Sequence, residues 1–120
     1  LQFWTGSEWT TPVNADIDEV TFSLYRKATT AHVEIIWPDG KRERVDVKPE
    51  ERKTFRYHQT ARRDRWFAPQ KFLTIRVTPL WTPAPTLEES NDTRQLGVYV
   101  SELNMTSHLR EEANEPEAKY

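Results

Sequence analysis

The sequence predicts an all-β fold, an antiparallel β-sandwich of the jelly-roll kind, followed by a polar C-terminal tail. Three observations lead to this prediction. Short stretches that alternate between apolar and polar residues recur along the chain, as strands with one packed face do. Turn-forming residues separate these stretches. The chain is also rich in large flat side chains, with five Trp, four Tyr and five Phe against one Met, which suits sheets better than helices.

The clearest strands lie in the first half of the chain, at residues 19–25 and 32–37. The side chains expected on their packed faces are Val20, Phe22, Leu24, Val33, Ile35 and Trp37. Pro38-Asp39-Gly40 then predicts a hairpin turn, because Pro fixes φ, Asp bonds its own backbone and Gly accepts a positive φ. The second arm, residues 42–48, carries charge on one face, so we expect an edge strand protected by that charge.

Further strands are predicted at residues 54–58, 72–78 and 96–103, with residues 2–4 as an edge strand. The last long strand places Leu96, Val98 and Val100 on one face and Gly97, Tyr99 and Ser101 on the other. Residues 59–70 and the Pro-containing connection after residue 79 lose this periodicity and are expected to be long loops. The resulting seven or eight strands fit a sandwich or jelly roll.

A chain of 120 residues is long enough for one core and too short for two. We therefore expect one sandwich domain at residues 1–105 and a polar tail at 106–120, either a short helix or disordered. With no Cys in the chain, disulfides and Cys-ligated zinc are excluded. No stretch approaches the roughly 20 apolar residues of a membrane span, so no direct membrane insertion is predicted. The start at Leu1 suggests a module of a longer protein.

Charge is segregated along the chain. Residues 1–40 carry six acids and two bases, residues 41–76 five acids and twelve bases, and residues 77–120 eight acids and three bases, for sums of −4, +7 and −5. A basic middle block can attract phosphate, acidic glycan or anionic lipid headgroups. It can equally be a solvated surface that the acidic flanks neutralise in part.

Aromatic side chains in loops, or on an exposed sheet face, are the candidates for ligand binding. A sugar ring stacks its C–H face on an aromatic ring while its hydroxyls need fixed polar partners. The predicted ligand-binding residues are Trp66, Arg63, Arg65, Trp81, Tyr99 and Trp9. Trp66 leads this set because arginines precede it in a loop. The alternative for each aromatic residue is that it closes one end of the core.

Other chemistries have little support. The run at residues 62–67 could contact nucleic acid, but Asp64 interrupts it and the net charge is −2, so no nucleic-acid partner is predicted. Residues 14–19 offer oxygen ligands for calcium but lack the Gly and bidentate Glu of an EF-hand. His32, His58 and His108 are far apart in the sequence. We predict no metal, no cofactor and no catalytic residue, since no nucleophile elbow or phosphate loop occurs.

The segment at residues 81–103 combines a Pro-containing loop, acidic residues, Asp92-x-Arg94-x-Leu96-Gly97 and an alternating strand. It resembles the closing strand of a β-sandwich domain attached to bacterial envelope-glycan enzymes, including membrane glycosyltransferases and phosphoglycerol-transferase-like proteins. Gly6-Ser7-Glu8-Trp9 is similar to that family's opening, a loop before the first long strand. Here Trp9 is followed by Thr-Thr-Pro rather than by another Gly and Trp. A site built from paired tryptophans is therefore in doubt.

The resemblance implies a non-catalytic accessory module, carbohydrate-binding-like, of a larger bacterial cell-envelope polysaccharide enzyme. Its expected partners are a polysaccharide or glycan and a neighbouring domain of the parent protein, at the cell envelope or its periplasmic face. The alternative is a structural or protein-interaction domain that positions a neighbouring catalytic domain.

The residues of the matched motif have a structural interpretation of their own. Asp92 can accept backbone donors in a turn, and Arg94 can pair with Asp92 or Glu8. Gly97 permits a bulge or the close approach of another strand. These three residues are thus predicted to anchor the last strand. In the functional alternative, Asp92 and Arg94 bind sugar hydroxyls.

Overall fold

The computed structural model describes residues 2–61, 69–83 and 94–107. These residues form eight strands: β1 (Phe3–Trp4), β2 (Glu8–Val13), β3 (Glu19–Tyr25), β4 (Ala31–Ile36), β5 (Arg42–Val47), β6 (Arg52–His58), β7 (Lys71–Thr78) and β8 (Tyr99–Thr106). Six of the eight have bounds within two residues of those predicted from the alternation of apolar and polar residues.

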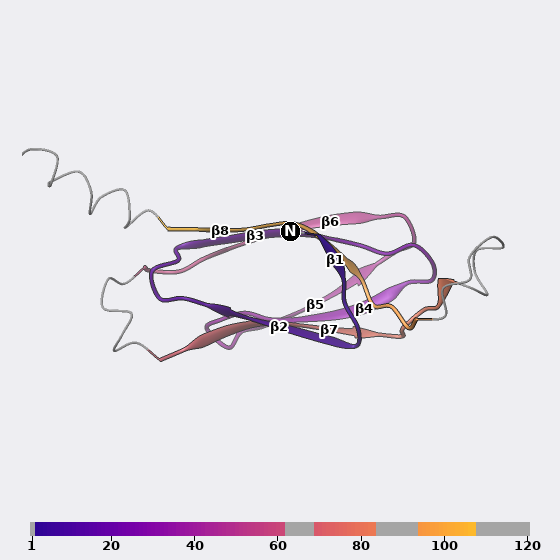
Figure 1. The fold of residues 1–120 in the computed structure, drawn as a ribbon, viewed down its shortest axis with the longest axis horizontal. Coiled ribbons are helices and arrows are strands. Elements are labelled where there is room, and N and C mark those ends of the chain that lie inside the picture. Colours follow the sequence, from indigo (N-terminus) through magenta and orange to yellow (C-terminus); the bar gives the residue numbers. More distant parts are fainter. Residues whose placement is uncertain (1, 62–68, 84–93, 108–120) are drawn as a thin grey trace, which may run out of the picture.

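The strands form two four-stranded antiparallel sheets that lie one above the other (Figure 1). One sheet has the order β1-β8-β3-β6 and the other the order β2-β7-β4-β5. Within the sheets β1 pairs with β8, β2 with β7, β3 with β6 and β4 with β5. The chain is therefore one long hairpin rolled into two layers, which is the jelly-roll arrangement. The predicted fold class is confirmed.

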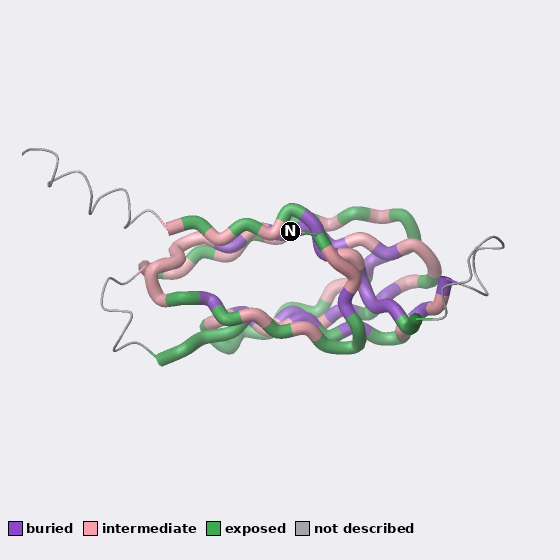
Figure 2. Tube along the Cα trace, in the orientation of Figure 1, coloured by how far each residue is buried: buried purple, intermediate pink, exposed green. Residues whose placement is uncertain are grey.

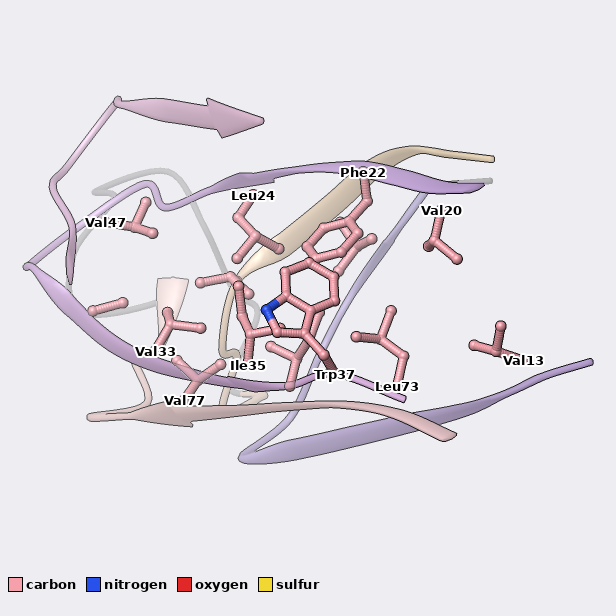
Figure 3. Close-up of a cluster of buried hydrophobic side chains, with 14 residues drawn as sticks. Val13, Val20, Phe22, Leu24, Val33, Ile35, Trp37, Val47, Leu73 and Val77 are labelled. Carbon is pink, nitrogen blue, oxygen red and sulfur yellow. The ribbon is translucent and has the colours of Figure 1, made fainter. Parts of the chain in front are cut away.

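The core lies between the two sheets, where the buried faces of the strands meet (Figures 2 and 3). Its members are Val13, Val20, Phe22, Leu24, Ala31, Val33, Ile35, Trp37, Val47, Leu73, Ile75, Val77, Val98 and Val100. Each large apolar side chain buried in this way contributes about 1.5–3 kcal/mol. Trp37 closes one side of this core by stacking on Tyr57, with ring centroids 5.2 Å apart and planes 6° from parallel.

The hairpin between β4 and β5 turns at Pro38-Asp39-Gly40, as predicted. Gly40 has a φ of 88°, a value that costs a Gly little and a residue with a side chain much more. The Gly40 amide donates to Trp37 O at 2.8 Å, and the Lys41 amide donates to Asp39 Oδ1 at 2.9 Å. The turn residues thus satisfy the backbone where the two strands separate.

The expected loop at residues 6–9 is wrong in its second half, because β2 begins at Glu8. Trp9 packs against the core and Val13 is buried in it. Successive residues of β2 therefore alternate between the inner and the outer face, as they do in a strand. Pro12 hid this pattern in the sequence, since Pro lacks the amide that a central strand needs. It is tolerated here because β2 is an edge strand.

The last strand contains a β-bulge that the alternation did not predict. Ser23 pairs with Ser101 but Thr21 pairs with Asn104, so β8 carries one extra residue between these pairs. Glu102 lies in the bulge with a φ of 57°. The faces predicted for the residues of this strand are correct up to Ser101. Beyond the bulge, the residues predicted for one face lie on the other.

The ends of the predicted last strand and domain differ slightly from the structure. Leu96 forms an isolated bridge with Trp81, and β8 proper runs from Tyr99 to Thr106, one residue past the expected end of the sandwich at 105. The predicted tail from residue 108 onward lies outside the described residues. Within the described part of the chain, no helix is long and apolar enough to cross a bilayer.

Arg26 is completely buried at the end of β3, with 0% of its surface exposed. Its Nε donates to Ala28 O at 2.9 Å and its Nη1 to Gly97 O at 3.2 Å. Its Nη2 donates to Pro79 O at 2.5 Å and to Thr29 Oγ1 at 2.9 Å. Burial lowers the pKa of Arg26. The planar guanidinium therefore ties β3 to the segments that lead to Trp81 and Tyr99, with carbonyl oxygens as its principal partners.

Candidate functional site

An aromatic row crosses the outer face of the β1-β8-β3-β6 sheet. In strand register Trp4 pairs with Tyr99, Tyr99 with Tyr25, and Tyr25 with Arg52. These side chains face outward, because their strand neighbours Leu24 and Val100 are buried on the inner face. We call Trp4, Tyr99, Tyr25 and Arg52 the aromatic row. It brings together four segments that are distant in the sequence.

The three rings of the row are half-buried, and they line a hollow. With the Arg52 side chain they line an open volume of about 310 Å³, at the lower end of the range of about 300–1,000 Å³ for small-molecule sites. The rings of Trp4 and Tyr99 lie 5.2 Å apart and are tilted by 54°. They therefore offer two differently oriented surfaces rather than one flat platform.

Planar polar groups surround the row. The Tyr99 hydroxyl donates to Gln2 Oε1 at 2.8 Å. Arg52 Nη1 lies 3.5 Å from Glu102 Oε1, and the Ser23 hydroxyl donates to Glu102 Oε2 at 3.4 Å. Glu102 lies in the bulge of β8, and its carboxylate contacts both Ser23 of β3 and Arg52 of β6. Aromatic surfaces flanked by an amide, a guanidinium and a carboxylate can stack on a ring and hydrogen-bond to its substituents.

Tyr99 is the one predicted ligand-binding residue that lies in the aromatic row. Trp81 is only 6% exposed, and its ring packs edge-on against Trp4 at a centroid distance of 5.3 Å. Trp9 is half-buried on the inner face of β2, where its ring lies 4.8 Å from that of Phe3. Trp81 is therefore almost fully buried, Trp9 packs in part against the core, and neither lies in the aromatic row.

The leading predicted site, Trp66 with Arg63 and Arg65, falls in residues 62–68, outside the described residues. It stays a prediction. Among the residues of the row, sequence reasoning missed Trp4, Tyr25 and Arg52 as ligand-binding candidates. Alternation had placed Tyr25 on the outward face of its strand, and that was the available signal. The row itself becomes visible only when the pairing of the strands is known.

The residues of the closing motif are only partly described. Asp92 lies outside the described residues, and Arg94 is exposed just before the bridge at Leu96. Gly97 meets the turn after β1, because its amide donates to Thr5 O at 2.7 Å and a Cβ there would lie 2.4 Å from Gly6 O. Because Gly97 has no side chain, the chain at this position can pack closely against the residues that follow Trp4.

Metal binding has no support among the described residues, where no group of three or more His, Cys, Asp or Glu side chains is placed to hold an ion. His32 Nδ1 lies 2.7 Å from Asp46 Oδ1, and His58 Nδ1 lies 3.6 Å from Glu19 Oε2. His108 is outside the described residues. The two described histidines are thus each next to a carboxylate of a neighbouring strand.

The basic middle block is largely paired where it is described. On β5, Arg42 and Arg44 lie 3.3 and 3.5 Å from the carboxylate of Glu34. On β6, Arg56 lies 3.9 Å from Glu19, and Arg52 lies beside Glu102. The partners come from the acidic flanks of the sequence. Strand pairing therefore favours the solvated and partly neutralised surface over a continuous anion-binding patch.

Comparison of this chain with protein-family models, with curated proteins and with solved structures finds no match in any of the three.

Proposed function

We propose that this domain is a non-catalytic accessory module that binds a glycan through the aromatic row, as part of a larger bacterial cell-envelope polysaccharide enzyme. The observation that carries the binding proposal is the register of β1, β8, β3 and β6, which aligns Trp4, Tyr99 and Tyr25 beside Arg52. The context of a parent enzyme rests on the resemblance of the closing motif, Asp92 to Gly97.

The chemistry of the row fits a sugar ligand better than an apolar one. Its hollow is open and lined by Arg52, and Gln2 and Glu102, both exposed, are hydrogen-bond partners of Tyr99 and Arg52. An apolar ligand would strip water from these groups without replacing their hydrogen bonds, which costs free energy. Sugar hydroxyls can replace those hydrogen bonds while the C–H faces of the ring contact Trp4 or Tyr99.

Calorimetric titration with neutral oligosaccharides, such as cellotetraose and maltotetraose, and with envelope-type polysaccharides tests the proposal. We expect weak binding that Tyr99→Ala reduces. Losing the contact of one aromatic ring costs about 1.5 kcal/mol or more, which is about tenfold in Kd. The matched control is Phe72→Ala, which removes an exposed ring, 47% exposed, from the opposite sheet. It should leave the affinity unchanged.

Two results would count against glycan binding at the row. One is the absence of binding to any glycan by well-folded protein. The other is binding that Tyr99→Ala and Phe72→Ala affect equally. Either result would favour a structural or protein-interaction domain that positions a neighbouring catalytic domain. Circular dichroism and urea unfolding of each variant establish that the comparison is made between folded proteins.

A further inference from the structure

The outer face of the other sheet carries a row of alternating charge. In strand register Glu8 of β2 pairs with Arg76 of β7, Arg76 pairs with Glu34 of β4, and Glu34 pairs with Arg44 of β5. Acid and base therefore alternate across all four strands. We call Glu8, Arg76, Glu34 and Arg44 the charged row. Because the two sheets pack through their inner faces, it lies on the side of the domain opposite the aromatic row.

The members of the charged row are bonded to one another. Arg76 Nε lies 2.8 Å from Glu8 Oε1, and its Nη1 lies 3.4 Å from Glu34 Oε1. Hydrogen bonding to Glu8 and the charge of Glu8, followed by the same effects of Glu34, raise the pKa of Arg76. Glu34 also lies near Arg42 and Arg44, and its side chain is only 17% exposed. The row is thus a network with one carboxylate at its centre.

A trough lies beside the charged row, with a second polar wall facing it. The second wall consists of Thr78, His32 and Asp46, which also pair in strand register. The two walls are two residues apart along each strand, or about 6.6 Å. The volume between them is about 580 Å³, well inside the range of about 300–1,000 Å³ for small-molecule sites. The trough is therefore larger than the hollow at the aromatic row.

The charges of the trough select the kind of ligand that it can hold. Each acid that lines the trough lies beside a basic group: Glu8 beside Arg76, Glu34 beside Arg76 and Arg44, and Asp46 beside His32. An anion would have to compete with Glu34 for its arginines, and a cation would have to compete with the arginines for Glu34. Drawing the arginines away would leave the Glu34 carboxylate without a partner, and because its side chain is only 17% exposed, water would make up for the lost pairing only in part.

A neutral hydroxyl group avoids this cost, because it donates one hydrogen bond and accepts others. Neighbouring hydroxyls can donate to a carboxylate of the row and accept from the adjacent guanidinium, without adding net charge. We propose that this trough is a second binding site that takes a neutral, hydroxyl-rich saccharide. The site is independent of the aromatic row, and with both sites occupied the domain would hold two glycan segments on opposite faces.

Amide chemical-shift mapping of isotope-labelled protein tests the inference. Cellotetraose is titrated as the neutral probe and tetragalacturonic acid as the anionic one. We expect cellotetraose to shift the amides of His32, Glu34 and Arg76, and tetragalacturonic acid to shift them far less. The shifts should persist in Tyr99→Ala, which removes a ring from the aromatic row. This persistence separates the trough from the proposed function, because each site is read through its own amides.

Variants of the trough complete the test. Glu34→Gln should raise the apparent Kd, measured from the amide shifts at the trough, by about tenfold. That is the effect expected for a lost charge-assisted hydrogen bond of about 1.4 kcal/mol. The control Glu43→Gln removes the same charge from the exposed edge strand β5, outside the trough, and should have no effect. Thr78→Val removes a hydroxyl from the second wall without touching the ion pairs, in case Glu34→Gln unfolds the sheet.

The inference is overturned if cellotetraose does not change the chemical shifts of the trough amides, whether or not it changes those of the Tyr25 and Tyr99 amides. It is overturned as well if tetragalacturonic acid binds the trough more tightly than cellotetraose, since the argument from the pairing of its charges would then fail. Equal effects of Thr78→Val and Glu43→Gln on binding would also count against it.

Discussion

Replacing Gly97 with Ala should destabilise the domain strongly, because there is no room for a Cβ at this position. A Cβ there would lie 2.4 Å from both Gly6 O and Thr5 Oγ1 and 3.3 Å from Gly6 C. Contacts shorter than 3.0 Å are essentially never found, so the two chain segments must separate. Both close oxygens belong to the turn after β1, which is hydrogen-bonded to the chain at Gly97 and Val98.

The magnitude follows from the overlap and from those hydrogen bonds. Overpacking of a well-packed interior costs about 1–3 kcal/mol. The Gly97 amide donates to Thr5 O at 2.7 Å, the Thr5 amide donates to Val98 O at 2.9 Å, and the Val98 amide donates to Thr5 Oγ1 at 3.0 Å. Losing one of these bonds costs about 0.5–1.5 kcal/mol. The free energy of unfolding should therefore fall by about 2–4 kcal/mol.

Urea unfolding followed by tryptophan fluorescence measures this change. With a slope of about 2 kcal/mol per molar urea, the midpoint should fall by about 1–2 M. Gly6→Ala is the matched control, because no atom lies within 4 Å of a Cβ at that position, and it should change stability by less than about 0.5 kcal/mol. If Gly97→Ala unfolds at the same urea concentration as Gly6→Ala, the close packing of these two segments is refuted.

Two further predictions concern single side chains. Arg26→Lys should lower stability by about 3 kcal/mol, because an ammonium cannot reach all the oxygens that the buried fork binds; Arg42→Lys on the exposed edge strand should change it by less than about 0.5 kcal/mol in the same urea assay. Burial, and then the charge of Asp39, raise the pKa of Tyr57 above its ordinary value of 10.0. The stability that depends on the neutral phenol is complete below pH 10.0 and is lost as the pH rises through the raised pKa. Across this alkaline range the midpoint temperature of thermal unfolding should therefore fall more steeply with pH for the wild-type protein than for Tyr57→Phe. Equal slopes of midpoint against pH would contradict the raised pKa.

The strands with clean alternation could be predicted from the sequence because burial on one face leaves a pattern of period two. β3 was predicted with the bounds that it has in the structure, since Val20, Phe22 and Leu24 all face the core. β2 was not predicted, because Pro12 interrupts a pattern that only an edge strand tolerates. The bulge at Glu102 could not be predicted either, since one extra residue in β8 has meaning only relative to its partner β3.

The aromatic row depends on register in the same way. Tyr25 and Tyr99 could each be placed on an outward face from their own strands, but their alignment with Trp4 and Arg52 requires three separate strand pairings. A slip of one residue in any of these would turn the whole strand over. The signal in the sequence is therefore an outward-facing aromatic residue near the end of a strand. The site forms where strand pairing brings three such residues next to one another.

The same nested pairing also explains why the charge segregation along the sequence does not survive folding. In a rolled hairpin, neighbouring strands come from distant parts of the chain, so the basic block at residues 41–76 is interleaved with strands from both acidic flanks. Glu34 meets Arg42, Arg44 and Arg76 in one sheet, and Glu102 meets Arg52 in the other. Each outer face consequently presents groups of both signs in close pairs. Such a surface favours neither anionic nor cationic ligands. It is better suited to neutral ligands that can hydrogen-bond to both partners of a pair.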